Sequence, residues 1–355
     1  MRKRGKAPVR PRRVVINEAV CEGCGDCGAK SSCLSVQPVS TELGRKTQID
    51  QTSCNTDYSC LDGDCPSFVT VEATQSHQRP RTDAAIADVP EPTHRAEVRP
   101  GAPWSMVAVG IGGTGVVTLN QVIGTAAFAE GLVVRGLDQT GLSQKGGPVV
   151  SHLVLSVDDV AGANAVGPGS ADLFLALDPV AATDPRFLSK LAPGRTATVA
   201  SRALVPTVSM VLGEERPADA AAMLEVLAAR SRPDAFFDVD AAGAAEAAFG
   251  DSAGANVVML GAAYQRGHVP LSASSIEDAI RANGVAVEAN LGAFRLGRLL
   301  VHDPGAVTPR GRAGTIERAP SPAAVAAVQR LAGARSLPDI ARRRAAELVD
   351  YQGRR

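Results

Sequence analysis

Seven cysteines lie within the first 65 residues of this 355-residue chain, and the rest of the chain contains none. The first three are separated by two residues each, and four more follow at wider intervals: Cys21, Cys24, Cys27, Cys33, Cys54, Cys60 and Cys65. Three thiolates at this spacing can converge on one corner of an iron–sulfur cube, whereas disulfides would be spread over the whole chain. The cysteines therefore predict an iron–sulfur module at the N-terminal end of the chain.

The later cysteines repeat the pattern of the first three with one substitution, because Asp57 stands where the middle cysteine of the run Cys54–Cys60 would be. In two-cluster ferredoxins the distant cysteine, which precedes a proline as Cys65 does, serves the other cluster. Crossing the halves in this way predicts two ligand sets: Cys21, Cys24, Cys27 and Cys65 for one [4Fe–4S] cluster, and Cys33, Cys54 and Cys60, with Asp57 as a candidate, for a second. Since a carboxylate is a harder ligand than a thiolate, we expect the second cluster to be a [4Fe–4S] with a labile corner or a [3Fe–4S].

Two other interpretations of the cysteines stay open. Cys21 and Cys24 could form half of a four-cysteine zinc site, although such sites use two separated pairs and give a third cysteine at the same interval no role. The chain could also hold one cluster and leave the remaining thiols unused. Iron and acid-labile sulfide in the anaerobically purified protein distinguish these cases.

A glycine-rich segment follows an apolar run and precedes a helical stretch, and its glycines are Gly110, Gly112, Gly113 and Gly115. A loop of this kind can hold a pyrophosphate at a helix N-terminus. Dinucleotide binding also needs an acidic residue at the end of the next strand, but the strand expected at 132–137 ends in Arg135 and Gly136, with Asp138 beyond it. We therefore expect a tight turn against a neighbouring subunit or an anionic group of a substrate, rather than NAD binding.

A second polar loop contains Ser143, Gln144, Lys145, Gly146 and Gly147. It fits an ordinary surface loop and a loop that approaches a phosphate or carboxylate equally well. His152, in the following strand, is expected to be a core or edge histidine rather than a catalytic base. No spacing of Ser, His, Asp or Glu indicates a self-contained active site, so no catalytic residue is predicted.

The elements that must position these residues separate by composition. Apolar runs at 105–110, 150–157, 171–178, 196–201 and 235–240 alternate with helical stretches such as 116–130 and 218–229, which predicts an α/β fold with a mostly parallel sheet, Rossmann-like in kind. The expected organisation is a basic tail (1–13), a ferredoxin-like iron–sulfur module (14–74), a linker or extended arm (75–103), the α/β domain (104–302) and a linker with amphipathic helices near 323–332 and 337–351 (303–355). The last helix looks unfinished, which suggests a missing continuation.

Composition limits the classes of function. Lys and Arg number 37 and so do Asp and Glu, so a dedicated nucleic-acid or membrane-surface binder, normally basic overall, is not expected. The basic start lacks the apolar run of a signal peptide, and no window is apolar enough for a membrane helix. We expect a cytoplasmic protein, where thiols stay reduced and can bind metal.

Taken together, these motifs resemble the fused, long-chain form of indolepyruvate:ferredoxin oxidoreductase, in the 2-oxoacid:ferredoxin oxidoreductase family. The resemblance lies in the cysteine-rich stretch 14–71, in the glycine-rich stretches around 107–127 and 136–156, which include GLSQKGG, and in 256–272 and 276–298. It implies that 104–302 is a gamma-type domain of such an enzyme. The tail from Leu337 to Gln352 is similar to the opening of a further C-terminal domain.

The resemblance implies oxidative decarboxylation of an arylpyruvate with coenzyme A, thiamine diphosphate chemistry, and electron transfer through iron–sulfur clusters to a ferredoxin. The chain departs from that pattern because it contains no G-D-G motif for a metal-bound thiamine diphosphate. The expectation is therefore a fragment or split chain, inactive alone, that forms an oligomer with a chain binding thiamine diphosphate and Mg. The alternatives are a standalone ferredoxin-like redox carrier whose α/β domain docks partners, and an inactive gene remnant.

Overall fold

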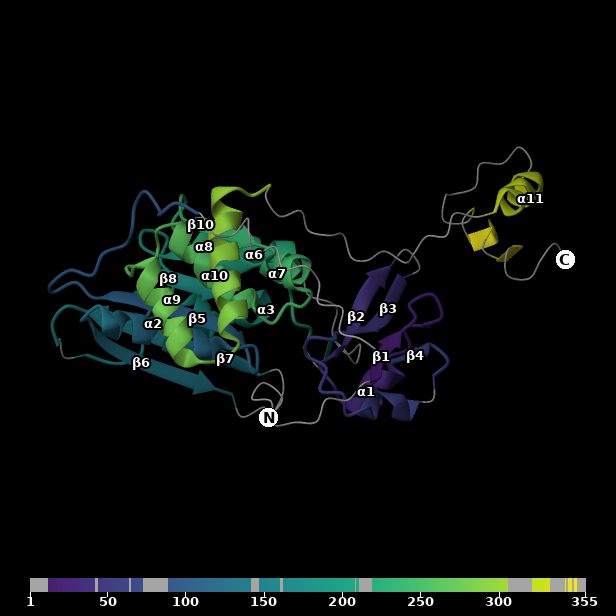
Figure 1. Ribbon diagram of the computed structural model, residues 1–355, viewed down its shortest axis with the longest axis horizontal. Coiled ribbons are helices and arrows are strands. Elements are labelled where there is room, and N and C mark those ends of the chain that lie inside the picture. The colour runs from purple at the N-terminus through teal and green to yellow at the C-terminus, as the bar shows by residue number, and fades with distance from the viewer. Residues whose placement is uncertain are drawn as a thin grey trace. The chain divides into compact units, whose positions relative to one another are not determined.

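The computed structural model describes residues 12–41, 44–63, 65–72, 89–141, 147–159, 162–207, 209–210, 219–305 and 321–332, and six residues between 342 and 349. The described residues form a cysteine-containing module, an α/β domain and a small helical unit at the C-terminal end (Figure 1). Of the expected parts, residues 1–11 of the basic tail and most of the helix at 337–351 lie outside the described residues.

The α/β domain is built on a six-stranded sheet in the order β10-β9-β8-β5-β7-β6. Its strands are β5 (Trp104–Ile111), β6 (Val133–Thr140), β7 (Pro148–Ser156), β8 (Leu173–Ala176), β9 (Ala197–Ser201) and β10 (Phe236–Val239). The pairs β5–β8, β8–β9 and β9–β10 are parallel, whereas β7 runs antiparallel to both β5 and β6. The mostly parallel sheet predicted from the apolar runs is confirmed.

The strands form at these apolar runs because both faces of the sheet are covered. All eight residues of β5 are buried. Met106 and Ala108 belong to one hydrophobic cluster, and Val107 and Val109 belong to the cluster on the opposite face. A strand buried on both faces needs an unbroken apolar run instead of an alternating one, and this is the pattern that the sequence carries.

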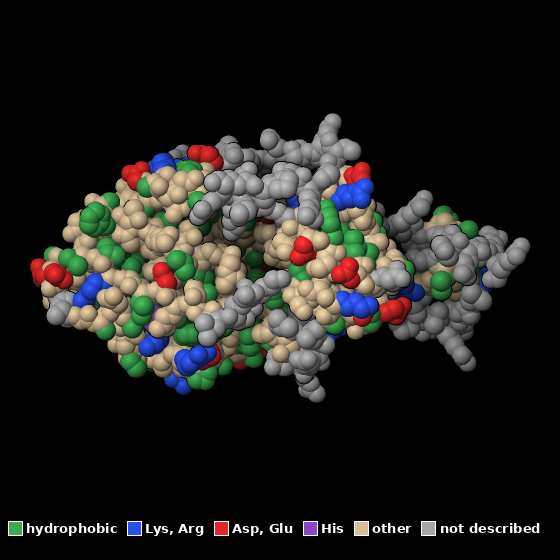
Figure 2. All heavy atoms as spheres, turned by 90° about the horizontal axis from the view of Figure 1, so that it is seen from below, with side chains coloured by type: hydrophobic (Ala, Val, Ile, Leu, Met, Phe, Trp, Pro, Cys, Tyr) green, Lys and Arg blue, Asp and Glu red, His purple; other side chains and the backbone are tan. Residues whose placement is uncertain are grey.

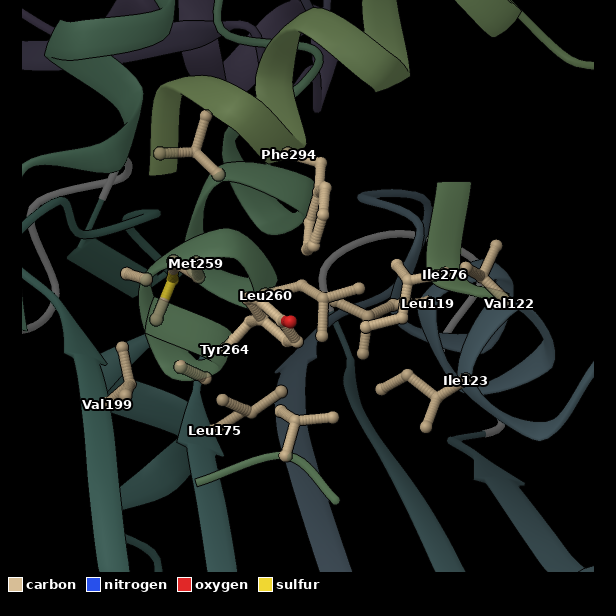
Figure 3. Close-up of a cluster of buried hydrophobic side chains, with 14 of the residues drawn as sticks. Leu119, Val122, Ile123, Leu175, Val199, Met259, Leu260, Tyr264, Ile276 and Phe294 are labelled. Atoms are coloured by element: carbon tan, nitrogen blue, oxygen red, sulfur yellow. The ribbon is translucent and has the colours of Figure 1, made fainter. Parts of the chain in front are cut away.

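Helices cover the two faces unequally. The larger cluster combines the sheet with α2 (Val116–Ala129), α7 (Ala241–Phe249), α8 (Ala255–Gln265), α9 (Ala273–Asn283) and α10 (Val287–His302). Its centre is the group drawn in Figure 3, where the rings of Tyr264 and Phe294 lie 5.5 Å apart and tilted. The smaller cluster lies under α3 (Pro179–Ala182), α4 (Pro185–Leu188) and α6 (Ala220–Arg230).

The helices α8 and α10 cross in close contact at two glycines. A Cβ atom on Gly297 would lie 1.9 Å from the carbonyl oxygen of Val258, and one on Gly261 would lie 2.0 Å from the carbonyl oxygen of Phe294. No real side chain fits at such distances, so both positions require glycine.

The expected linker contains an ordered strap, residues 89–99, that lies along α8 and α10. Arg298, only 7% exposed, donates from Nη2 to the carbonyl oxygens of Val89 (2.9 Å) and Pro90 (3.1 Å) and to Glu91 Oε1 (3.1 Å). Glu91 also accepts a hydrogen bond from the hydroxyl of Tyr264. This part of the segment is therefore packed on the domain as an extended arm.

The cysteine module consists of two small sheets and two short helical segments. Strands β1 (Arg12–Ile16) and β4 (Phe68–Glu72) pair antiparallel, and β2 (Val36–Thr41) pairs with β3 (Gly44–Ile49). The helix α1 (Asp26–Ser31) and the 3-10 helix η2 (Ser59–Gly63) lie side by side. Its core mixes aliphatic side chains with the thiols themselves: Val14, Ile16, Val36 and Ile49 are buried together with Cys21 and Cys60.

The C-terminal unit contains α11 (Pro322–Ala332), which packs through Ala324 and Val328 on Ala346. Among the described residues, no helix is long and apolar enough to cross a membrane. Basic and acidic side chains lie interspersed on the face shown in Figure 2.

Candidate functional site

The first cysteine run is a loop held by two left-handed glycines. Gly23 and Gly25 have φ angles of 68° and 81°, and the N–H of Gly23 donates to the Sγ of Cys21 over 3.3 Å. A Cβ on Gly23 would lie 2.1 Å from the carbonyl oxygen of Arg45. The loop then enters α1, which carries Cys27.

The second run has the same backbone shape without the glycines. Thr56 and Tyr58 occupy the positions of Gly23 and Gly25, and their φ angles are also positive, 54° and 68°. The N–H of Thr56 donates to the Sγ of Cys54 over 3.4 Å, as Gly23 does to Cys21. The internal repeat seen in the sequence is therefore a repeat of loop geometry, and in the second copy a β-branched residue adopts a conformation that such residues rarely adopt.

The thiols fall into two groups. Burial raises the pKa of the Cys27 thiol, and the neighbouring thiols of Cys21 and Cys24 raise it further. We call these three cysteines the first thiol group. Burial likewise raises the pKa of Cys60 to about 11, with contributions from Cys54, Cys33 and Asp57. We call Cys33, Cys54 and Cys60 the second thiol group.

This grouping joins Cys33 to Cys54 and Cys60, although Cys33 is closer in sequence to Cys27. The crossed ligand sets of two-cluster ferredoxins stay a prediction for this chain, and Cys21, Cys27, Cys33, Cys54 and Cys60 all lie in or against one small core. Cys65 lies between η2 and β4, where its Sγ is 3.0 Å from the hydroxyl oxygen of Ser67. Its assignment to the first group stays a prediction.

The donor chemistry of the two groups fits iron–sulfur clusters. Each group offers soft thiolates, and each contains a sulfur that accepts a backbone N–H, a contact that tunes the potential of such clusters. Within the described part of the chain, no group of three or more His, Cys, Asp or Glu side chains is arranged to hold a single metal ion. Iron–sulfur binding itself, and the type and number of clusters, stay predictions.

Asp57 is exposed, and both of its carboxylate oxygens accept hydrogen bonds. Oδ1 accepts from the backbone N–H of Ser59 (3.1 Å) and from its hydroxyl (2.9 Å). Oδ2 accepts from Nδ2 of Asn55 (2.8 Å). The carboxylate thus links Asn55 and Ser59 by hydrogen bonds, and the two residues with positive φ, Thr56 and Tyr58, lie between them in the sequence.

In the α/β domain, the two predicted glycine segments meet. The N–H of Gly112 donates to the carbonyl oxygen of Gly147 over 3.0 Å. Gly113 and Gly115 have φ angles of 90° and 97°, and a Cβ on Gly110 would lie 2.9 Å from the side chain of Val116. The remaining predicted residues of the second loop lie outside the described residues: Ser143, Gln144, Lys145 and Gly146.

The first glycine loop follows β5, at the point where the strand order changes direction. After β5 the chain forms β6 and β7 on one side of it, and then β8, β9 and β10 on the other side. Ligands of open α/β sheets commonly bind at such a point, beyond the carboxyl ends of the strands. Backbone N–H groups and the start of a 14-residue helix are available there for an anionic group.

Two polar residues near the carboxyl ends of the strands were missed from the sequence: Asn256 contacts the glycine loop, and Asp178 holds the segments after β8 and β9. Asn256 on α8 donates from Nδ2 to the carbonyl oxygen of Thr114 over 2.9 Å. Asp178 follows β8, is 2% exposed, and accepts from the N–H groups of Ala181 (2.9 Å) and Val205 (2.8 Å). Burial raises the pKa of Asp178. Its signal in the sequence was an acid directly before a proline, the pattern of a helix N-cap.

One expectation about the glycine loop is corrected. Asp138 lies within β6, which continues to Thr140 because its pairing with β7 extends to Val149. Its carboxylate accepts from Ser151 Oγ and from Asn120 Nδ2 (3.0 Å). Moreover, β6 is separated from β5 by β7, so Asp138 does not occupy the ribose-binding position of a dinucleotide fold.

His152 is a core histidine, as predicted. It is 3% exposed, and its Nδ1 accepts the backbone N–H of Val166 over 3.2 Å. Burial lowers its pKa, with a contribution from Lys190.

The model of the family described as "Pyruvate ferredoxin/flavodoxin oxidoreductase" matches residues 105–300, more than half of the chain. The chain is 32% identical over 197 residues to indolepyruvate oxidoreductase subunit IorB of Pyrococcus horikoshii, covering 55% of this chain and 94% of that protein. The same subunit of Thermococcus kodakarensis matches at 32% over 197 residues, with the same coverage. Among solved structures, the gamma subunit of a keto/oxoacid ferredoxin oxidoreductase from Geobacter sulfurreducens has 20% identity and a TM-score of 0.39, covering 56% of this chain and 98% of that one.

Proposed function

We propose that this chain, which belongs to the pyruvate ferredoxin/flavodoxin oxidoreductase family, combines the gamma-type domain of a 2-oxoacid:ferredoxin oxidoreductase with an electron-transferring iron–sulfur module. One observation carries the proposal. The domain that matches the family shares its chain with a module in which five cysteines lie in or against one small core, and two of its cysteine loops have positive φ angles at equivalent positions.

The reaction that we propose for the complete enzyme is the oxidative decarboxylation of an arylpyruvate such as indole-3-pyruvate. The 2-oxoacid and coenzyme A give acyl-coenzyme A, carbon dioxide and a proton, and two oxidised ferredoxins each receive one electron. The names of the two archaeal relatives support indolepyruvate as the substrate. Thiamine diphosphate and Mg would be bound by a partner chain, and the fused long-chain enzymes are the form that the cysteine-rich segment resembles.

Within this reaction the module's residues would hold two clusters, which pass electrons one at a time. The first thiol group and Cys65 would bind a [4Fe–4S] cluster, and the second thiol group would bind the other. The N–H groups of Gly23 and Thr56 donate to the sulfurs of Cys21 and Cys54 and would stabilise negative charge on them as ligands. Because Cys24 is exposed, the first group offers a route from the module to an external ferredoxin.

The glycine loops of the α/β domain would serve an anionic group or a neighbouring subunit. Gly110, Gly112, Gly113 and Gly115 keep the backbone between β5 and α2 free of side chains, and Asn256 fixes this loop. The hydroxyl of Ser143, the amide of Gln144 and the ammonium group of Lys145 are proposed from the sequence as further groups for a phosphate or carboxylate.

Both archaeal relatives are named as subunits, which supports a requirement for a partner chain. We propose a complex with a thiamine diphosphate-binding chain of the same enzyme, assembled in the cytoplasm, where the thiols would stay reduced.

The test is a reconstitution under anaerobic conditions. The chain loaded with iron and sulfide is mixed with the thiamine diphosphate-binding chain of the same enzyme, and dye reduction is followed with indolepyruvate and coenzyme A. We expect reduction only when both chains are present. Turnover by this chain alone would contradict the proposal. A loaded chain that exchanges electrons with ferredoxin but never accepts them from the partner would instead be a standalone redox carrier.

A further inference from the structure

The two-stranded sheet of the cysteine module, β1 with β4, has one face on the thiols and one face in solvent. On the inner face, Val14 and Ile16 are buried in the same small core as Cys21 and Cys60. Side chains alternate between the two faces of a strand, so the residues that alternate with Val14 and Ile16 point away from the thiols. One layer of backbone therefore separates the outer face of this sheet from the cysteines.

The outer face consists of Arg13 and Val15 of β1 and of Val69 and Val71 of β4. Arg13 is paired with Val71, and Val15 is paired with Val69, and directly paired residues lie side by side on one face. Val15, Val69 and Val71 are 37%, 45% and 46% exposed. Single exposed valines are common, but three at paired and diagonal positions form one continuous apolar surface.

The charge of the outer face is positive. Arg13 is the charged residue among its four members, and it is exposed. Glu72, at the end of β4, does not offset this charge, because its Oε1 lies 2.9 Å from Nε of Arg12 in an ion pair. In the sequence, residues 1–11 add five basic residues and no acidic residue directly before β1. A partner that complements this face has acidic groups around an apolar contact.

We propose that the outer face of the β1–β4 sheet is the docking surface for the module's electron acceptor, a small acidic ferredoxin. This inference rests on the proposed electron-transfer function and adds the surface at which the electron leaves the chain. One electron passes from a reduced cluster of the module to the oxidised ferredoxin, and no bond or proton is exchanged. A second copy of the chain does not complement this face, because a two-fold contact would bring Arg13 against the same positive face.

The experiment uses the full chain, reconstituted anaerobically with iron and sulfide, reduced with dithionite and freed of excess reductant. An acidic [2Fe–2S] ferredoxin is the acceptor, and stopped-flow visible circular dichroism gives the second-order rate constant of its reduction. The affinity of the two oxidised proteins is measured by calorimetry. Iron content and the rate of reduction of a small dye, dichlorophenolindophenol, show whether each variant is intact.

The variants separate the apolar contribution from the charge. V69T/V71T removes apolar surface but keeps the branched side chains that suit a strand, and R13E reverses the charge. The matched control is V20T, because Val20 is 43% exposed in the same module and lies outside the sheet.

At low ionic strength we expect V69T/V71T and R13E each to lower the second-order rate constant about tenfold, and V20T to leave it unchanged. In about 0.5 M salt, R13E should approach the wild type because exposed charges are screened, whereas V69T/V71T should stay slower. V69T/V71T should also weaken the affinity for oxidised ferredoxin. Iron content and dye reduction should be the same in all variants.

Three results would overturn the inference while leaving the iron–sulfur function standing. One is a loaded chain whose ferredoxin reduction is as fast in V69T/V71T and R13E as in the wild type. Another is slowing by V20T alone, which would move the contact to the first cysteine loop. The third is a wild-type dimer that V69T/V71T dissociates without changing ferredoxin reduction, since the face would then join two copies. Absence of iron and sulfide from the wild-type chain would overturn the proposed function itself.

Discussion

The α/β domain and the cysteine module obtain their order from different sources. The domain is held by its own packing: its sheet is buried on both faces, and α8 and α10 touch through glycine backbone. A bound group would therefore add little to the domain's stability. In the module, a few aliphatic residues share a small core with Cys21 and Cys60, so that thiols predicted as ligands are themselves part of the packing. A core of this size is marginal by itself, and metal binding is expected to supply much of the module's folding free energy. The comparison predicts that the domain folds without a bound group, and that the module needs its metal to be stable.

The largest effect should follow from breaking the domain's closest packing. G297A places a methyl group 1.9 Å from the carbonyl oxygen of Val258, so α8 and α10 must separate. We expect a loss of at least about 3 kcal/mol in the free energy of unfolding, measured by chemical denaturation. The matched control is G194A, because a Cβ at Gly194 meets nothing within 4 Å. Equal stability of the two variants would show that the helices do not cross as described.

A pH titration should detect a partly buried histidine of the α/β domain, His268. Burial, together with Arg266 and Arg232, lowers the pKa of His268 from 6.5 to about 4. The folded state therefore favours the neutral imidazole. The contribution of His268 to the free energy of unfolding is complete above pH 6.5, and about 2–3 kcal/mol of it is lost as the pH falls toward 4. H268Q should flatten the stability curve over this range in urea denaturation, and H302Q, at the exposed end of α10, should not. An unchanged curve for H268Q would contradict the burial of this side chain.

The strap gives a smaller effect. R298A removes the side chain that binds the carbonyl oxygens of Val89 and Pro90 and lies 5.1 Å from the centre of the Tyr264 ring. We expect a loss of about 2 kcal/mol and faster hydrogen exchange in residues 89–99. R281A is the control, since Arg281 forms exposed ion pairs on α9 that contribute little. Exchange in the strap that is unaffected by R298A would mean that other contacts hold it.

The smallest effect distinguishes the two cysteine loops. T56G relieves a β-branched residue from a φ angle of 54° and should stabilise the module by about 1 kcal/mol. G23A should do the reverse in the equivalent position of the first loop, because its Cβ would lie 2.1 Å from the carbonyl oxygen of Arg45. Thermal unfolding of the module measures both. Stabilisation by T56G together with destabilisation by G23A would support the repeated loop geometry. Destabilisation by T56G would contradict the strained geometry of the second loop.

The sequence predicted those features that depend on residues close together in the chain. The strands follow unbroken apolar runs, and the cysteine runs that begin at Cys21 and at Cys54 form loops with positive φ angles at equivalent positions. It placed the end of β6 too early because the length of that strand is set by its partner β7 and not by its own residues.

Features that depend on distant partners could not be predicted. Asn256 reaches a loop 142 residues earlier, and Arg298 binds a carbonyl 209 residues earlier. Neither contact leaves a local pattern. The helix α8 was not identified because apolar residues surround it on nearly every side, so it lacks the stripe that marks an amphipathic helix.

The central claim is that two crossed thiol groups hold two clusters, and removing one thiol at a time tests it most directly. C27A, C33A and C60A are each reconstituted anaerobically, and iron, sulfide and electron paramagnetic resonance signals are measured for each. We predict that C27A loses one cluster signal, and that C33A and C60A both lose the other, although Cys33 is nearer in sequence to Cys27. Loss of the same signal from C27A and C33A, or a wild-type chain that contains zinc and no acid-labile sulfide, would contradict the account.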